Sequence, residues 1–194
     1  MDHTKTGILI CERRKALGLT QKQLADQLNV SDKAVSKWER GLGCPDVSLL
    51  TRLCDILGVD AESLLSGELN TNESTGGNMK KLKFYICPTC GNLITSTGDA
   101  AVSCCGQKLT SLTPIKASED EKLSVEIIEN DYFISSAHEM TREHYISFVA
   151  LLTGDSIILR KRYPEWNLDT RIPRIGHGTL VWYCTVHGLQ YQLI

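Results

Sequence analysis

Four of the eight cysteines lie close together and could supply four thiolates to one metal ion. They are Cys87, Cys90, Cys104 and Cys105. Neighbouring residues on a strand point to opposite faces, so the adjacent pair can converge only at a turn, which Gly106 permits. Iron and zinc both accept four thiolates in a tetrahedron. The alternative is a thioredoxin-like redox pair, but that requires a helix after the motif, and the segment 91–102 has no helical pattern.

Three histidines and one cysteine form a second candidate metal site. His138 and His144 are six residues apart, and Cys184 and His187 follow about forty residues later. On a regular strand Cys184 and His187 would point to opposite faces, so we expect Gly188 to mark a turn that brings them together. Imidazole and thiolate ligands of this kind suit iron.

Residues 6–66 predict five short helices. Thr20 should cap one helix, with Gln23 in the capping-box position, and Ser31 and Asp60 should cap two others. A further helix is expected to begin at Pro45 and to stop at Gly58. Trp38 is predicted to be buried, and Cys11, Cys44 and Cys54 are predicted to be small packing residues.

The two helices around residue 30 should leave a polar, partly basic face outside. Its residues are Ser31, Asp32, Lys33, Ser36, Lys37 and Arg40. A major groove of DNA admits a helix with such a face. The net charge is −2, so any DNA contact has to depend on this local face rather than on a basic domain.

The rest of the chain predicts a flexible linker at 68–78 and a β-rich second half of the 194 residues, with β-branched and aromatic runs separated by turn residues. No apolar run is long enough for a membrane span, and the first residues do not read as a signal peptide. We therefore expect a cytoplasmic protein, in which cysteines more often bind metal than form disulfides.

The helical half resembles the phage-repressor/Cro-type (XRE-like) helix-turn-helix family. The matching residues are Thr20, Gln21, Leu24, Ala25, Leu28, Val30, Ser31, Val35, Ser36, Trp38, Glu39, Arg40 and Gly41. The resemblance implies a five-helix domain over residues 1–67 whose third helix reads double-stranded DNA. It implies that Gln21 donates to a phosphate and that the polar face contacts bases or backbone.

The four-cysteine segment resembles desulforedoxin and the first domain of desulfoferrodoxin, which implies a small β domain over 79–114 holding a rubredoxin-like iron. Residues 115–194 resemble the superoxide reductase domain of desulfoferrodoxin, an immunoglobulin-like β-sandwich. By position, His138, His144 and His187 would be equatorial iron ligands and Cys184 the axial ligand. Lys122 matches a lysine that steers superoxide, but Leu123 stands where the family has a fourth histidine. His177 is a substitute that does not match the motif.

These patterns together predict a multidomain α and β protein that regulates transcription. We expect it to bind a DNA operator as a homodimer and to sense redox state or superoxide through iron, with zinc as an alternative metal. Because Leu123 cannot bind metal, we do not expect efficient superoxide reduction. Two other functions remain open: an active superoxide reductase with an accessory DNA-binding domain, served by a small electron-transfer protein, and a metal-stabilised dimerisation scaffold without sensing.

Overall fold

The computed structural model describes residues 2–69, 72 and 78–194. The chain divides into two compact units, Met1–Thr71 and Asn72–Ile194. The linker predicted at 68–78 lies largely outside the described residues. Within the described ranges, no helix is long and apolar enough to cross a membrane.

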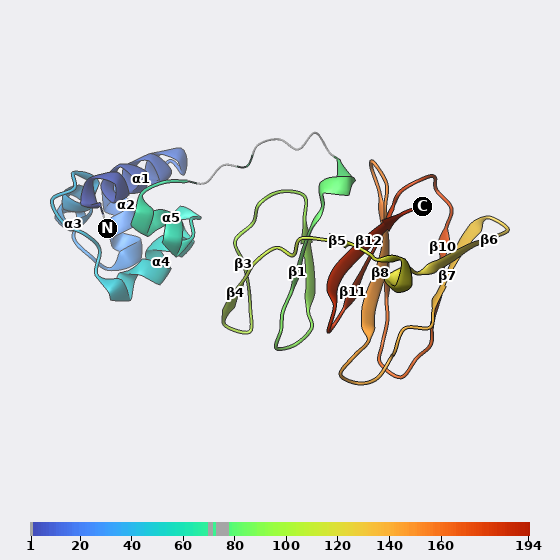
Figure 1. Ribbon diagram of the computed structural model, residues 1–194. Coiled ribbons are helices and arrows are strands. Elements are labelled where there is room, and N and C mark those ends of the chain that lie inside the picture. The colour runs from blue at the N-terminus through green and yellow to red at the C-terminus, as the bar shows by residue number, and fades with distance from the viewer. Residues whose placement is uncertain (1, 70–71, 73–77) are drawn as a thin grey trace. The chain divides into compact units, whose positions relative to one another are not determined.

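The first unit contains five α-helices (Figure 1). They are α1 (His3–Ala16), α2 (Gln21–Leu28), α3 (Asp32–Glu39), α4 (Val47–Leu57) and α5 (Ala61–Ser66). The Thr20 capping box is present, and the side chains of Ser31 and Asp60 accept hydrogen bonds from Ala34 N and Ser63 N. These side chains satisfy backbone N–H groups that the first turn of a helix leaves without partners.

Two details of the helical half differ from the sequence prediction. Helix α4 begins at Val47 rather than at Pro45, because the Asp46 carboxylate accepts from Ser48 N and makes Asp46 the cap. Cys44 is exposed in the loop before α4 and is not a packing residue, whereas Cys54 is buried. Trp38 is only 7% exposed and belongs to the core of the unit, as predicted.

The second unit is built from strands. They are β1 (Lys83–Ile86), β2 (Leu93–Ser96), β3 (Val102–Cys104), β4 (Gln107–Leu109), β5 (Ile115–Lys116), β6 (Ser124–Ile128), β7 (Asp131–Ser136), β8 (Ile146–Leu152), β9 (Ile157–Lys161), β10 (Leu168–Pro173), β11 (Thr179–Cys184) and β12 (Gly188–Leu193). Two short 3₁₀ helices, η1 (Met79–Lys81) and η2 (Glu119–Glu121), precede β1 and β6. The sequence had not predicted β2, β4, β5, β10 and β12, because none of them is a continuous run of β-branched and aromatic residues.

Two sheets form the predicted β-sandwich. One sheet has the order β5-β12-β11-β8-β9 and the other has the order β10-β7-β6. Their inner faces share a hydrophobic core that includes Trp182, Ile134, Ile172 and Leu151, all fully buried. Figure 1 shows the two sheets as successive layers, with the hairpins β1-β2 and β3-β4 on the other side of the larger sheet.

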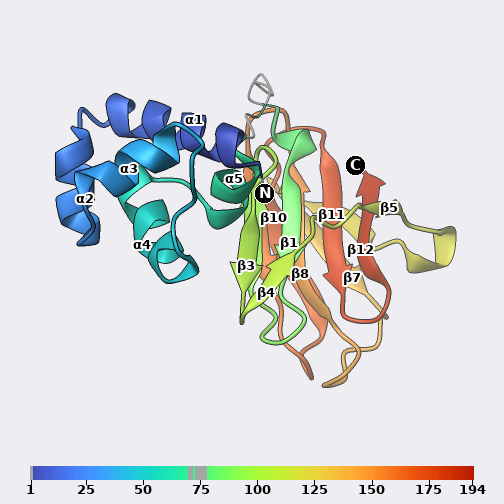
Figure 2. The same cartoon turned by 90° about the vertical axis from the view of Figure 1, so that its left-hand side faces the viewer.

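The hairpin β1-β2 packs on the outer face of the five-stranded sheet (Figures 1 and 2). The Phe84 ring stacks on the Phe148 ring at a centroid distance of 5.6 Å. Leu82 of the hairpin side and Val181 and Leu189 of the sheet belong to the same buried cluster. The segment 79–114 thus shares a hydrophobic core with the sandwich, and its division from residues 115–194 as a separate domain remains a prediction.

Candidate metal centres and nucleic-acid interface

Two tight turns bring the four cysteines together. Cys87 follows β1, and its turn closes through hydrogen bonds from Gly91 N to Cys87 O and from Cys87 N to Asn92 O. Cys104 ends β3, and Cys105 and Gly106 form the two-residue connection to β4, both with positive φ. Positive φ at both loop positions is typical of hairpin turns that match the twist of the strands. The turn predicted at Gly106 is therefore present.

The sulfur atoms of these cysteines fit one tetrahedral metal ion. All four Sγ atoms lie within 4.8 Å of one another, with Cys90 and Cys104 3.6 Å apart and Cys104 and Cys105 4.0 Å apart. Metal–sulfur bonds of ~2.3 Å would place the sulfurs of a tetrahedron ~3.8 Å apart. All four thiols are free of disulfides. The geometry needs little adjustment to accept a metal.

The pKa values of the thiols also favour a bound cation in this cluster. Hydrogen bonds from the backbone N–H groups of Cys90 and Thr89 lower the pKa of Cys87 to about 6, although burial opposes this. The neighbouring sulfurs raise the pKa of Cys105 to about 12, and Cys90 has the largest effect. Without a cation the cluster therefore cannot hold four thiolates at neutral pH, and a bound metal ion would reverse this by stabilising the charge.

The second cluster lies at one end of the sandwich. His138 follows β7, His144 precedes β8, and His187 lies in the turn between β11 and β12. A register shift between Tyr183 and Cys184 pairs Cys184 with Ile146 at the start of β8. Such a bulge re-aims the side chain at the end of a strand. Gly188, with a φ of +80°, ends the turn as the sequence predicted.

The ligand atoms of this cluster also lie within 4.8 Å of one another. The ring centroids of His138 and His144 are 4.6 Å apart, and those of His144 and His187 are 4.8 Å apart. Cys184 is fully buried, and its Sγ accepts hydrogen bonds from Val186 N and His187 N at 3.4 Å each. These two contacts fix the position of the sulfur atom in the turn.

A threonine that the sequence analysis missed joins the two halves of this cluster. Thr185 Oγ1 donates to Glu143 O at 2.7 Å and accepts from Tyr145 N at 3.1 Å. Thr185 N also donates to Tyr145 O. These bonds tie the loop that carries His144 to the turn that carries His187. A threonine next to a cysteine carries no sequence signal for this role, because the contact forms only when the loops meet.

The remaining predicted residues are not among the four residues whose ligand atoms converge. Lys122 pairs with Glu119, with Nζ and Oε1 2.6 Å apart, and its side chain is 37% exposed. Leu123 is 4% exposed and lies in the sandwich core that also contains Cys184. His177 is exposed before β11 and does not join the cluster of ligand atoms. Residue 123 therefore contributes packing where the resemblance had implied a ligand.

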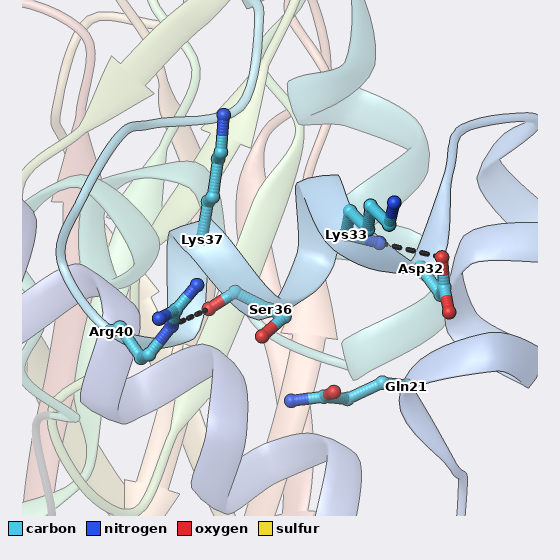
Figure 3. A pocket seen from close by; sticks show the side chains of 6 residues that line it. All are labelled: Gln21, Asp32, Lys33, Ser36, Lys37 and Arg40. Atoms are coloured by element: carbon cyan, nitrogen blue, oxygen red, sulfur yellow. Dashed lines mark hydrogen bonds between the residues drawn. The ribbon is translucent and has the colours of Figure 1, made fainter.

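The predicted DNA-binding residues gather on one face of the first unit. A surface groove of about 290 Å³ is lined by Gln21, Asp32, Lys33, Ser36, Lys37 and Arg40 (Figure 3). Ser31 lies at the N-terminus of α3, where its hydroxyl caps the helix. Arg40 Nε donates to Ser36 O, so the guanidinium lies along the helix and beside the groove.

A buried ion pair connects this face to the core. Arg14 and Glu39 side chains are 9% and 5% exposed, with Arg14 Nε and Glu39 Oε1 2.5 Å apart and Arg14 Nη2 and Glu39 Oε2 3.0 Å apart. Gln21 Nε2 donates to Glu39 Oε2 at 2.8 Å. The Gln21 amide has a second N–H, which remains available for the predicted phosphate contact.

Comparisons with known proteins match both units. A helix-turn-helix family model matches residues 12–64. The chain is 45% identical over 76 residues to the HTH-type transcriptional activator BcrR of Enterococcus faecalis, a match that covers 38% of this chain and 37% of that protein. This chain thus spans little more than a third of BcrR.

The second unit has relatives of a different kind. The chain is 32% identical over 123 residues to desulfoferrodoxin of Desulfarculus baarsii, covering 56% of this chain and 94% of that protein. The crystal structure of the superoxide reductase from Treponema pallidum superposes with a TM-score of 0.50 at 20% identity, covering 58% of this chain and 98% of that chain, and so shows a shared fold. Since almost the whole length of a desulfoferrodoxin is matched, the chain belongs to the desulfoferrodoxin family, and its first unit is a helix-turn-helix domain.

Proposed function

We propose that the protein is a DNA-binding transcriptional regulator whose desulfoferrodoxin-like unit binds iron and responds to redox state or superoxide. The observation that carries this proposal is the coexistence in one chain of a polar groove along α3 and two converged sets of metal-binding side chains. A major groove accepts a helix of this kind, and the groove offers Lys33, Lys37 and Arg40 to phosphates.

Each metal cluster fits a resident metal. Cys87, Cys90, Cys104 and Cys105 would hold one iron ion, and zinc would fit the same four sulfurs. His138, His144, His187 and Cys184 would hold a second ion, because the Nε2 atoms of His138 and His144 are buried without a hydrogen-bond partner. A metal ion is the partner that such orphaned acceptors lack.

The second cluster is better suited to sensing than to turnover. An iron bound there would supply one-electron reduction of superoxide to peroxide. However, Leu123 belongs to the hydrophobic core and cannot complete the family's ligand set, so binding is weaker and the ion more easily lost. Lys122 would attract the superoxide anion to this side of the unit, although it is paired with Glu119.

We also propose that a homodimer in the cytoplasm binds a two-fold symmetric operator. The half-sites should lie about one helical turn apart, because each copy presents one reading helix. A small electron-transfer protein would be needed only if the second cluster turned over superoxide repeatedly, and this partner remains a prediction.

The proposal is tested by selecting genomic fragments with the full-length protein, reduced and oxidised, while iron content and visible absorption are recorded. We expect a preferred fragment and up to two metal ions per chain. Lys37→Ala should weaken binding and reduce the slope of log affinity against log salt by about 1. Lys15→Ala, which removes an exposed charge from α1, is the matched control and should leave that slope unchanged. Lack of preference for any fragment in both redox states would refute the regulator.

A further inference from the structure

We propose that Glu139 is a positioning residue of the second cluster. It holds His138 and His144 in the tautomer that binds metal. The inference rests on the metal role proposed above for this cluster. Glu139 directly follows His138 in the sequence, yet no pattern in the sequence shows where its carboxylate points. Its contacts assign it this role.

Glu139 contacts both rings through different groups. His138 Nδ1 hydrogen-bonds to the main-chain carbonyl oxygen of Glu139. His144 Nδ1 lies 3.1 Å from the carboxylate oxygen Oε2 of Glu139. A carbonyl oxygen and a carboxylate oxygen can only accept, so each ring has to donate from Nδ1. In a neutral imidazole the proton is then on Nδ1, and the lone pair is on Nε2.

The two Nε2 atoms are left without a partner inside the protein. Both are buried and have no hydrogen-bond partner. His138 and His144 also belong to the group of residues, with Cys184 and His187, whose ligand atoms lie within 4.8 Å of one another. One residue thus prepares two of the three imidazoles.

The charge of Glu139 contributes less than its geometry. Three neutral imidazoles and the Cys184 thiolate carry one negative charge, and the Glu139 carboxylate adds a second, which matches a divalent ion. The Glu139 side chain is 60% exposed, however, so water screens most of its electrostatic effect. Glu139 should therefore affect metal binding mostly by orienting His144. A carboxylate behind a ligating histidine commonly has this role.

The test compares three variants of the full-length protein whose four-cysteine site has first been loaded with Zn²⁺. Glu139→Ala removes the carboxylate but keeps the main-chain carbonyl. Glu139→Gln keeps an acceptor oxygen without the charge. Glu143→Ala is the matched control, because Glu143 lies in the same loop. Its main-chain carbonyl, which the substitution keeps, accepts the hydrogen bond from Thr185. Thermal unfolding of each variant checks that it is folded.

The first measurement is Co²⁺ affinity, with binding detected by the visible absorption of the thiolate-bound ion. We expect Glu139→Ala to weaken binding about 10- to 100-fold. Glu139→Gln should fall between Glu139→Ala and the parent, and Glu143→Ala should match the parent. Equal Co²⁺ affinity in Glu139→Ala and Glu143→Ala would overturn the positioning role.

The second measurement needs no metal in the cluster. Long-range ¹H–¹⁵N spectra of the histidine rings report which nitrogen carries the proton. The parent should show the Nδ1–H tautomer for His138 and His144. In Glu139→Ala only His144 should lose it, because the partner of His138 is main chain. An Nε2–H tautomer for His144 in the parent would refute the proposal. If the parent failed to bind Co²⁺, the proposed second metal site would be wrong, and the tautomers alone would decide the role of Glu139.

Discussion

At the scale of single residues, the helical unit contains a buried ion pair between Arg14 and Glu39. Arg14→Ala would leave the Glu39 carboxylate buried without its cation, which typically costs about 3 kcal/mol or more. We expect the free energy of unfolding of the helical unit to fall by this amount, as measured by urea denaturation followed by helical circular dichroism. Arg13→Ala is a matched control, since it removes only hydrogen bonds to carbonyl oxygens at the end of α4. A loss no larger than in the control would mean that the pair contributes little.

The same pair predicts an acid-sensitive helical unit. Burial tends to raise the pKa of Glu39, but hydrogen bonds from Arg14 and Gln21 and the Arg14 charge lower it overall. A lowered pKa in the folded state stabilises the unit fully above the unfolded-state value of ~4.3, and this stabilisation is lost as pH falls through the folded value. Glu39→Gln should therefore show a shallower loss of stability than the parent below about pH 4.3. Parallel curves for the two proteins would exclude this contribution.

Residues also divide into those that sequence could identify and those that it could not. Thr20, Ser31 and Asp60 were predictable, because a helix cap depends on neighbours two or three positions away. The contacts of Glu139 and Thr185 were not predictable, because they depend on where loops from different strands meet. Leu123 could be recognised as a departure from the family motif, but only the structure shows that it packs in the core.

At the scale of elements, we expect the hairpin β3-β4 to depend on a bound metal more than the hairpin β1-β2 does. Leu109 is the principal buried residue that β4 contributes to a small cluster with Tyr85 and Cys87, whereas β1 also stacks Phe84 on the sandwich. Removing one thiolate should therefore loosen one hairpin and not the other, since binding energy at such sites is also folding energy.

Cys104→Ser tests this difference. We expect loss of the four-cysteine metal and faster amide hydrogen exchange in β3 and β4, with little change in β1. Cys54→Ser is a control that replaces a buried cysteine of the helical unit, outside both clusters. Uniform exchange in both hairpins of the Cys104→Ser protein would show that the Phe84 contact does not protect β1 independently.

The pairing of elements also shows the limits of sequence patterns. The runs around β6, β7, β8, β9 and β11 were visible as β-branched and aromatic stretches. The strand β10 was not, because it contains only two large apolar residues, Leu168 and Ile172, and ends in Pro173. The shared core of Phe84 and Phe148 could not be predicted either, because it joins segments more than sixty residues apart, and nothing local specifies which faces meet.

At the scale of the whole molecule, one chain carries the proposed DNA-binding surface in its first unit and two candidate metal centres in its second unit. In the proposed regulator, a signal from the metal centres has two routes to the DNA. It can change the helical unit itself, or it can change how two copies of the chain are held together. The second route affects only DNA that engages both copies, because the second contact is then intramolecular and its strength depends on the effective concentration that the dimer sets.

Affinities for two DNA duplexes would distinguish these routes, one duplex with both half-sites and one with a single half-site. If dimer geometry carries the signal, chelation or oxidation of the full-length protein should change the affinity for the double site about tenfold or more and leave the single site unchanged, because an intramolecular contact can amplify affinity by 10² to 10⁴. Lys37→Ala should weaken the binding of the metal-loaded protein to both duplexes, and this result calibrates the assay. If chelation weakened binding to both duplexes by the same factor, the metal centres would be acting on the helical unit directly, and the dimer route would be wrong.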